Sequence, residues 1–351
     1  MNNNHQQFMQ RCLDLAQLGA GQVAPNPMVG AVLVYQDRII GEGYHRKYGE
    51  AHAEPNCLNS VADLNKHFIP AATLYVSLEP CAHFGKTPPC SNLIIEHQIK
   101  KLVIGCADPF EAVNGKGIAQ LTTAGIEVIT GVLEQAAIDL NKRFFVFQQQ
   151  QRPYIVLKWA ETANGKIASN TAERLHISNE YSNRLVHQWR GEEAAILIGT
   201  NTALKDNPSL TNRYGSGKNP IRLIIDLSLR LPIHLNVFDG QVPTIVFNYK
   251  KNTVENHLQY VQLNESLPMM PQILKTCYDQ QIQSVLVEGG AALLQSFIDL
   301  NIWDEARVIR NNNLFVETGL NSPVLKDERF IQTNKLGSDT IHYFKPISVS
   351  I

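Results

Sequence analysis

Strand-like and helix-like patterns alternate along the whole chain, and this alternation restricts the fold more than any other feature. Short apolar runs typical of buried strands occur in the first half at residues 29–35, 38–43, 73–78, 102–106 and 127–130. Helical spacing of apolar residues is found at residues 8–18, 54–66, 90–97, 117–123 and 134–147. In the second half we expect strands at 194–198, 222–226, 244–247 and 284–287, and helices at 179–190, 269–281 and 291–301. The pattern predicts an α/β architecture, with a largely parallel, covered sheet in the second half.

The chain is expected to divide near its middle. A chain of 351 residues suits two domains of roughly 150 residues each better than one. The helix at 134–147 runs into the polar segment 148–151, and Arg152-Pro153 then opens a strand at 154–159. We therefore expect one domain over residues 1–150 and a second over 151–351, joined without a long linker.

Composition limits the expected cellular location and the classes of binding partner. The 31 basic and 32 acidic residues give a net charge of -1, which argues against nucleic acid as a partner but allows a local pocket for one phosphate. We find no apolar run of about 18 residues and no signal-peptide pattern, so no membrane association is expected. Six cysteines are too few for a disulfide scaffold. Thiols in such a protein more often bind metal, and the expected location is the cytoplasm.

The first half carries a pattern of the metal-binding type. His52-Ala-Glu54 is followed by Cys81, after the strand at 73–78, and then by Cys90. One imidazole and two thiolates leave the fourth tetrahedral position for water, as a catalytic rather than a structural zinc site requires. Zinc lowers the pKa of bound water to about 7, which makes hydroxide available at neutral pH. The sequence thus predicts one catalytic Zn²⁺ per chain.

Glu54 lies two residues after the imidazole ligand. Because Pro55 is tolerated only in the first turn of a helix, we expect His52 and Glu54 at a helix N-terminus. From there Glu54 could take the proton of the water and pass it to a leaving amine. An HxE pair alone arises often by chance, and a buried cysteine usually only packs; the joint pattern favours a zinc site. The other cysteines have no such context and are expected to pack in cores: Cys12, Cys57, Cys106 and Cys277.

The spacing of the two cysteines is unusual. Base deaminases commonly show P-C-x-x-C, whereas eight residues separate Cys81 from Cys90 here. Lys86 lies in this longer loop. It could reach a charged substrate group, or it could be a solvated loop cation.

Read alone, the second half is less specific. A buried strand at 284–287 runs into Glu288-Gly289-Gly290 and then a helix, so backbone N–H groups there could approach a phosphate. A pair of glycines after a strand is also an ordinary turn, and no G-x-G-x-x-G fingerprint is present. Arg190 and Arg213 lie near element ends, where phosphate contacts are plausible, although isolated arginines are more often surface residues.

Together the motifs resemble the bifunctional deaminase–reductases of riboflavin biosynthesis. The resemblance covers nearly the whole chain and is weakest after about residue 305. In the first half it includes Pro25-Asn26-Pro27-x-Val29-Gly30, Gly43-Tyr44-His45, His52-Ala-Glu54, Glu79-Pro80-Cys81, Gly85-Lys86-Thr87-Pro88-Pro89-Cys90, Asp108-Pro109 and Gly115-Lys-Gly117. In the second half it includes Leu185-Val186-His187-x-x-Arg190, Ile198-Gly199-Thr200-x-Thr202, Asp206-Asn207-Pro208-x-Leu210-Thr211-x-Arg213 and Glu288-Gly289-Gly290.

The resemblance implies a cytidine-deaminase-like three-layer α/β/α domain followed by a dihydrofolate-reductase-like α/β domain. The first would deaminate 2,5-diamino-6-(5-phosphoribosylamino)pyrimidin-4(3H)-one at zinc. The second would use NADPH to reduce 5-amino-6-(5-phosphoribosylamino)uracil to 5-amino-6-(5-phosphoribitylamino)uracil. A homodimer or larger homo-oligomer is implied by analogy only.

The resemblance also carries residue roles. Asn26, His45 and Lys86 would hold the pyrimidine and its ribose phosphate. The residues implied to contact NADPH are Ala160, Thr202, Asp206 and Gly290. Those implied to bind the reductase substrate are Arg190, Leu210, Arg213 and Glu288, to which we add Arg174 as a hypothesis.

Four departures from the family pattern qualify these expectations. Phe110 stands where the family often has Asn. Thr162-Ala-Asn164-Gly165 replaces Ser-x-Asp-Gly, and Arg174-Leu-His176 replaces Ser-x-Trp. Arg310-Asn-Asn-Asn313 stands where the family has an apolar strand, which puts the late strands in doubt.

Three other interpretations stay open. One is a nucleotide or tRNA deaminase fused to an unrelated reductase, which the near-neutral charge and Lys86 disfavour. A second is a non-catalytic protein stapled by zinc, for which Glu54 would have no purpose. The third is a zinc deaminase whose second half is degenerate or acts on another substrate.

Overall fold

The structure, a computed structural model, describes residues 3–84, 88–111, 113–170, 175–214 and 217–347. These residues divide into two units, Met1–Gln151 and Arg152–Ile351. Within the described part, no helix has the length and apolar character needed to cross a membrane.

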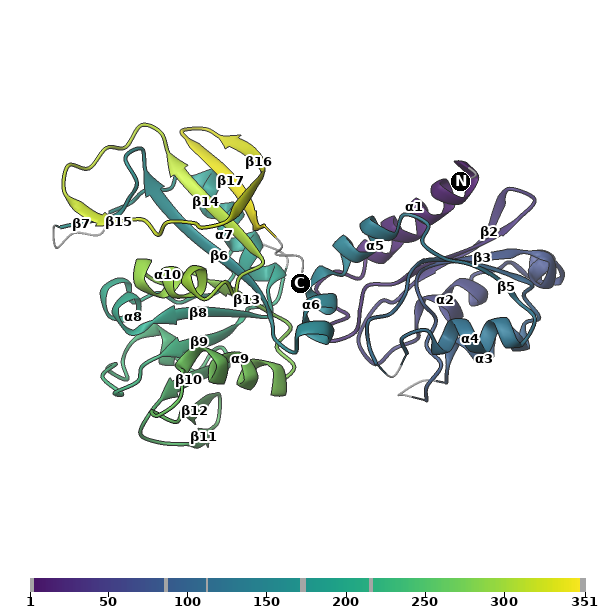
Figure 1. Cartoon of the computed structure of the whole chain (residues 1–351), viewed down its shortest axis with the longest axis horizontal. Helices are drawn as coiled ribbons and strands as arrows, with labels where there is room; N and C mark the ends of the chain where they lie inside the picture. The colour runs from purple at the N-terminus through teal and green to yellow at the C-terminus, as the bar shows by residue number, and fades with distance from the viewer. Residues whose placement is uncertain (1–2, 85–87, 112, 171–174, 215–216, 348–351) are drawn as a thin grey trace. The chain divides into compact units, whose positions relative to one another are not determined.

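The first unit is built on a five-stranded sheet of order β2-β1-β3-β4-β5 (Figure 1). Strands β3, β4 and β5 run parallel, and β1 and β2 form an antiparallel hairpin beside them. The strands are β1 Gly30–Tyr35, β2 Arg38–Tyr44, β3 Thr73–Leu78, β4 Lys101–Cys106 and β5 Glu127–Ile129. The helices are α1 Asn3–Gln17, α2 Ala53–Asn59, η1 Asp63–Ala71, α3 Cys90–Glu96, α4 Lys116–Thr123, α5 Glu134–Leu140 and α6 Lys142–Gln150.

Helices cover both faces of this sheet because its strands are apolar on both. Ala31 and Leu33 of β1 join a cluster with α2 and α3 residues such as Cys57. Val32 of the same strand faces the other way and packs with Cys12 of α1. Since successive strand residues point to opposite faces, this gives the expected three-layer α/β/α arrangement.

Two helices of the first unit are shorter than predicted. The expected helix at 134–147 is interrupted at Asn141, whose side-chain amide accepts a hydrogen bond from Met28 N–H at 2.8 Å and donates one to Met28 C=O at 2.9 Å. The expected helix at 54–66 ends at Asn59, because the Ser60 hydroxyl bonds back to the Cys57 carbonyl at 2.7 Å. Such side-chain bonds offer the backbone an alternative to continuing the helix.

The second unit is built on a ten-stranded sheet of order β11-β12-β10-β9-β8-β13-β6-β14-β17-β16 (Figure 1). The strands from β12 to β14 in this order are parallel, whereas β11, β17 and β16 pair antiparallel at the edges. The strands are β6 Tyr154–Thr162, β8 Ala195–Gly199, β9 Ile221–Ile225, β10 Thr244–Asn248, β11 Thr253–Glu255, β12 Leu258–Gln262, β13 Ser284–Val287, β14 Glu305–Asn311, β16 Glu328–Leu336 and β17 Asp339–Pro346. A separate pair joins β7 Lys166–Ser169 to β15 Gly319–Asn321. The helices are α7 Glu180–Glu192, α8 Thr200–Asp206, η2 Asn236–Phe238, α9 Met269–Asp279 and α10 Ala291–Asp299.

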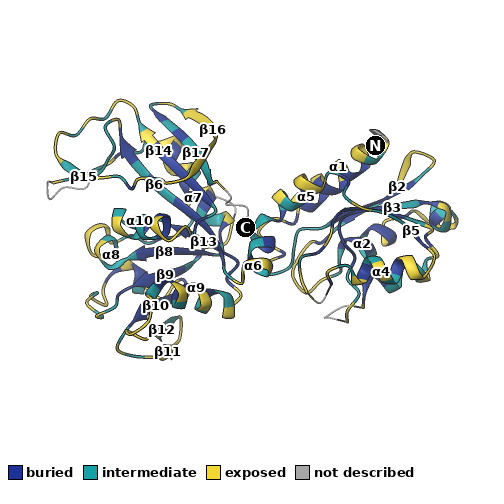
Figure 2. Cartoon of the chain, viewed as in Figure 1, coloured by how far each residue is buried: buried dark blue, intermediate teal, exposed yellow. Residues whose placement is uncertain are grey.

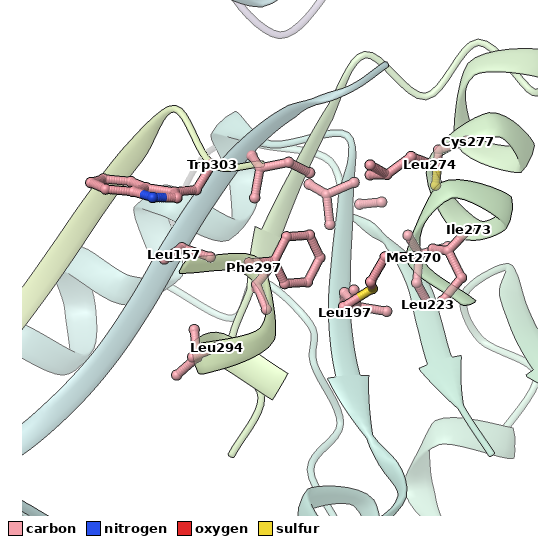
Figure 3. Close-up of a cluster of buried hydrophobic side chains, with 14 of the residues drawn as sticks. Leu157, Leu197, Leu223, Met270, Ile273, Leu274, Cys277, Leu294, Phe297 and Trp303 are labelled. Carbon is pink, nitrogen blue, oxygen red and sulfur yellow. The ribbon is translucent and has the colours of Figure 1, made fainter. Parts of the chain in front are cut away.

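The core of the second unit lies between the parallel strands and helices α9 and α10 (Figure 3). Leu157 lies on β6, Leu197 on β8 and Leu223 on β9. Met270 comes from α9 and Phe297 from α10. The central strands are buried along their length (Figure 2), as expected for parallel strands. The cysteines predicted to pack are all buried and free: Cys12, Cys57, Cys106 and Cys277.

The late strands form despite the polar run at 310–313. Strand β14 pairs with β6 as far as Asn311, and Arg310 lies opposite Glu161. The guanidinium of Arg310 donates two hydrogen bonds to Glu161 Oε1, at 2.8 and 2.6 Å. This cross-strand ion pair lets a charged residue occupy a strand position that is apolar in the family pattern.

Candidate active sites

Two helix N-termini and the end of a strand bring the predicted metal ligands together. His52 is the N-cap of α2, Cys81 follows β3, and Cys90 is the first residue of α3. The backbone N–H of Cys90 points at the Cys81 sulfur, 3.4 Å away. N-terminal helix ends favour negative charge, so this placement suits two thiolates.

The spacing of the three ligand atoms fits zinc. His52 Nδ1 lies 3.7 Å from Cys81 Sγ and 3.4 Å from Cys90 Sγ, and the three ligand atoms lie within 4.8 Å of one another. Tetrahedral bonds of about 2.0 Å to nitrogen and 2.3 Å to sulfur put those two atoms about 3.5 Å apart. The three side chains are therefore close enough together to hold a zinc ion.

A hydrogen bond between the two thiols moves their pKa values in opposite directions. A hydrogen bond from Cys90, with help from His52, lowers the pKa of Cys81 to about 4 against the opposing effect of burial. The same hydrogen bond, together with burial, raises the pKa of Cys90. Since a metal ligand must be a thiolate, metal binding at these residues would require both thiols to be deprotonated.

Glu54 is buried in the first turn of α2, with 3% of its surface exposed. Burial, and then the nearby charge of Cys81, raises the pKa of its carboxyl group. A carboxyl group with a raised pKa beside the three ligands can both accept and return a proton. The expected placement of His52 and Glu54 at a helix N-terminus is confirmed.

Asn26 and His45 lie next to each other beside the ligands. His45 Nδ1–H donates to the Ala51 carbonyl at 3.0 Å, which leaves Nε2 to accept from the Asn26 amide at 3.1 Å. Burial lowers the pKa of His45, and its ring meets that of His52 edge-on at 5.3 Å. Lys86, the third residue implied to bind this substrate, lies outside the described residues.

Glu79 is a buried carboxylate to which the sequence assigned no role. It accepts hydrogen bonds from the N–H groups of Asp108 at 3.2 Å, Gly115 at 3.0 Å and Ile118 at 3.1 Å. It thereby ties the segment leading to Cys81 to the loop before α4. The sequence did contain a signal for this role, because an acidic residue directly after an apolar strand is expected to be buried, and a buried carboxyl group must be hydrogen-bonded.

Asp108 is a third buried carboxyl group near this site, after Glu54 and Glu79. It accepts a hydrogen bond from Phe110 N–H at 2.8 Å, and burial raises its pKa to about 7. The Phe110 side chain, where the family often has Asn, lies edge-on to the ring of His83 at 5.9 Å. An aromatic edge thus replaces an amide on this loop.

The candidates of the second unit gather where parallel strands end. Strands β8, β13 and β6 are neighbours and run parallel, so their carboxyl ends meet at one edge, where α/β sheets bind ligands. Gly290 follows β13 as the N-cap of α10. A Cβ at that position would lie 3.6 Å from Thr202 Oγ1 of α8, so two of the cofactor candidates face each other. Ala160 is half-buried on β6, and Asp206 is exposed at the end of α8.

Arg190 and Glu288 form a buried ion pair. Arg190 Nε donates to Glu288 Oε1 at 2.9 Å and Nη2 to Oε2 at 2.7 Å, while Lys158 Nζ lies 3.9 Å from Oε2. Burial alone raises the pKa of Glu288, but Arg190 and Lys158 outweigh it and lower the value to about 2. Burial likewise opposes the charge of Arg190, and Glu288 nevertheless raises its pKa. The pair is a fixed group of opposite charges beside the end of β13. Lys158 is a third member of this group, and the sequence did not predict it.

Two other substrate candidates share a neighbouring loop. Leu210 is buried with a backbone φ of 54°, and Arg213 is exposed. Arg213 N–H donates to Nδ1 of the buried His187 at 3.1 Å. Arg174 lies outside the described residues, and His176 is exposed.

Asn164 has a structural role in place of the family Asp. Its Nδ2 donates to the Val316 carbonyl at 2.8 Å, and its Oδ1 accepts from Val316 N–H at 3.3 Å and from the Thr162 hydroxyl at 2.8 Å. A carboxylate could not donate to the carbonyl. The change to Asn therefore fastens the turn after β6 to the segment before β15.

Both halves match known families. Residues 2–106 match the cytidine and deoxycytidylate deaminase zinc-binding region, and residues 153–314 match the RibD C-terminal domain. Riboflavin biosynthesis protein RibD of Aquifex aeolicus is 38% identical over 96% of this chain and 97% of that protein. RibD of Bacillus amyloliquefaciens is 41% identical over 85% of this chain and 82% of that protein.

Solved structures agree over the full length. A diaminohydroxyphosphoribosylaminopyrimidine deaminase/5-amino-6-(5-phosphoribosylamino)uracil reductase from Thermotoga maritima superimposes with a TM-score of 0.89 and 35% identity, covering 98% of this chain and 99% of that one. Acinetobacter baumannii RibD superimposes with a TM-score of 0.89 and 29% identity, covering 99% of each chain. The expected fold class is confirmed. This chain belongs to the RibD family, the bifunctional deaminase–reductases of riboflavin biosynthesis.

Proposed function

We propose that residues 1–150 deaminate 2,5-diamino-6-(5-phosphoribosylamino)pyrimidin-4(3H)-one and that residues 151–351 reduce the resulting 5-amino-6-(5-phosphoribosylamino)uracil with NADPH. The product is 5-amino-6-(5-phosphoribitylamino)uracil. The observation that carries the proposal is the three-ligand cluster of His52, Cys81 and Cys90 beside the buried Glu54. The division after Gln151 and the two family matches support the assignment of one reaction to each unit.

In the first unit, His52, Cys81 and Cys90 would hold zinc. When bound, zinc supplies a water that ionises near neutral pH. The Glu54 carboxylate would take one proton from this water and give it to the ring nitrogen as the hydroxide adds to the carbon. It would then carry the second proton of the former water to the amine as the C–N bond breaks and ammonia leaves, and its raised pKa suits it to both transfers. Asn26, His45 and Lys86 hold the pyrimidine and its ribose phosphate in place. The neutral His45 ring, fixed at both nitrogens, gives this subsite a defined hydrogen-bonding pattern.

In the second unit, Ala160, Thr202, Asp206 and Gly290 contact NADPH, which supplies the hydride. The position of the Thr202 hydroxyl near the N-cap of α10 supports a phosphate position there, because backbone N–H groups at a helix N-terminus favour anions. The uracil ribosylamine is bound by five residues, which orient it without covalent chemistry: Arg174, Arg190, Leu210, Arg213 and Glu288.

We also propose a homodimer or larger homo-oligomer formed through residues 151–351, as the family resemblance implies. The edge strand β16 supports this, because it ends the ten-stranded sheet and is exposed along almost its whole length. Static light scattering of the purified chain tests it, and a monomeric mass at micromolar concentration would contradict it.

The functional assignment is tested by following ammonia release and NADPH oxidation together. Zinc-loaded protein should release ammonia from the diamino substrate without NADPH. A chelator should stop ammonia release but leave NADPH oxidation intact when the deaminated substrate is supplied directly. NADPH oxidation with the diamino substrate in the chelated protein would contradict the proposed order, and ammonia release without zinc would contradict the proposed site.

A further inference from the structure

The loop from Asp206 to Arg213 carries three of the proposed reductase contacts. Its backbone is irregular, with φ of 38° at Asn207 and 54° at Leu210, values that a residue other than glycine adopts at a cost. Such a path must be held by groups outside the loop. Which side chains hold it therefore bears on the reductase site.

One face of α7 supplies two of these groups. His187 and Arg190 are three residues apart, so they lie on the same side of the helix. Arg190 Nη1 donates to the Thr211 carbonyl at 3.4 Å, and His187 Nδ1 accepts from Arg213 N–H at 3.1 Å. The loop is thereby held next to the ion pair of Arg190 and Glu288. Arg190 is already a proposed substrate contact, whereas His187 has no role so far.

The surroundings of His187 favour an imidazole that accepts this hydrogen bond. It is 4% exposed, and the ring of Tyr214 packs edge-on against it at 4.8 Å. Burial, followed by the charges of Arg190 and Arg213, lowers its pKa to about 4, against smaller opposing effects of Glu288 and of the Thr211 backbone. The imidazole is therefore neutral near pH 7, so Nδ1 keeps the lone pair that the Arg213 N–H needs and Nε2 carries the proton.

We propose that His187 is a positioning residue of the reductase, which fixes Arg213 for contact with the phosphorylated substrate by accepting the hydrogen bond of its peptide N–H. The inference rests on the proposed role of Arg213 in the substrate site. It assigns a function to a residue of the Leu185-Val186-His187-x-x-Arg190 motif that the proposed function leaves without a role.

The test compares three substitutions of His187 in the full-length, zinc-loaded chain. Asn places an amide oxygen close to the position of Nδ1, so H187N keeps the acceptor. H187L is similar in volume and has none, and H187Q is polar but places its amide near the position of Nε2. We expect H187L and H187Q to raise the KM for 5-amino-6-(5-phosphoribosylamino)uracil about tenfold, as loss of one buried hydrogen bond predicts. H187N should recover most of this loss.

Other readouts separate positioning from packing. The kcat should change less than the KM in H187L, and the KM for NADPH and the rate of ammonia release should stay at wild-type values. If H187L lacks native tryptophan fluorescence, H187Q replaces it in the comparison. An unchanged KM in folded H187L or H187Q, or an equal rise in H187N, would overturn the inference, because either result leaves His187 as packing alone.

Arg213→Gln distinguishes this inference from the proposed function beneath it. If R213Q raises the KM and H187L does not, the positioning role fails while the substrate contact stands. If R213Q leaves the KM unchanged, the role of Arg213 fails and the inference fails with it. When both hold, H187L should add little to the KM in the R213Q background, because the two substitutions remove one interaction.

Discussion

Replacing Glu288 by Gln should destabilise the second unit strongly. The Glu288 side chain is 9% exposed, and it pairs through both oxygens with an Arg190 side chain that is 13% exposed. Its pKa of about 2 against an ordinary 4.5 corresponds to about 3 kcal/mol of stability near pH 7. Loss of one partner of a buried pair costs a similar amount, because the other charge is left without compensation.

The assay uses a feature of the sequence: the three tryptophans, Trp159, Trp189 and Trp303, all lie in the second unit. Tryptophan fluorescence during urea unfolding therefore reports on this unit. A loss of about 3 kcal/mol lowers the urea midpoint by on the order of 1.5 M. Asp279→Asn is the matched control, because it breaks the exposed pair with Lys275 in α9 and should cost less than about 0.5 kcal/mol.

The stability contributed by the Glu288 carboxylate should fall as the pH falls. Because the pKa of Glu288 is lowered in the folded state, its contribution is complete above the unfolded value of 4.5 and is lost as the pH falls toward 2. Gln resembles the protonated acid, so the gap between wild type and E288Q should narrow by about a third between pH 5 and pH 3.5. A destabilisation no larger than that of the Asp279 control, or a gap that does not depend on pH, would refute the reasoning.

Three further predictions concern the hydrogen bonds of Glu79 and Asn164 and the binding of zinc. Glu79→Gln offers one acceptor where two oxygens now serve three N–H groups, so hydrogen exchange at Asp108, Gly115 and Ile118 should speed up while one zinc stays bound; unchanged protection would speak against this. Asn164→Asp should lower the free energy of unfolding of the second unit by about 1–3 kcal/mol, since the Val316 carbonyl loses its donor; an unaltered urea midpoint would rule this out. Removal of zinc by a chelator should lower the thermal midpoint of the first unit but leave that of the second unit, reported by tryptophan fluorescence, unchanged. Scanning calorimetry together with fluorescence measures both midpoints, and an unchanged midpoint of the first unit would contradict this prediction.

Elements buried on both faces were the most predictable from the sequence. Strands β3 Thr73–Leu78 and β13 Ser284–Val287 have the predicted bounds, because continuous apolar runs between turn signals leave little choice of element. The three proposed metal ligands stand at element boundaries, since Cys81 follows β3, His52 is the N-cap of α2 and Cys90 begins α3. The motif could therefore be recognised in the sequence before the fold was known.

Elements defined by distant partners were not predictable. Strand β16 is exposed on both faces, so it has no apolar alternation to indicate a strand. Asn141 interrupts a helix by pairing with Met28, and Arg190 pairs with a carboxylate 98 residues away. Such bonds depend on the folded arrangement and leave no local pattern in the sequence.

The most direct test of the account is Glu54→Gln in the full-length chain, with zinc content, ammonia release and NADPH oxidation measured on one preparation. We predict that the variant keeps one zinc per chain and oxidises NADPH with the deaminated substrate at the wild-type rate. Its ammonia release should fall by a factor on the order of 10³, because a general acid–base group has been removed. Near-normal ammonia release from zinc-loaded E54Q would contradict the proposed deaminase site, and loss of NADPH oxidation as well would contradict the assignment of the two reactions to separate units.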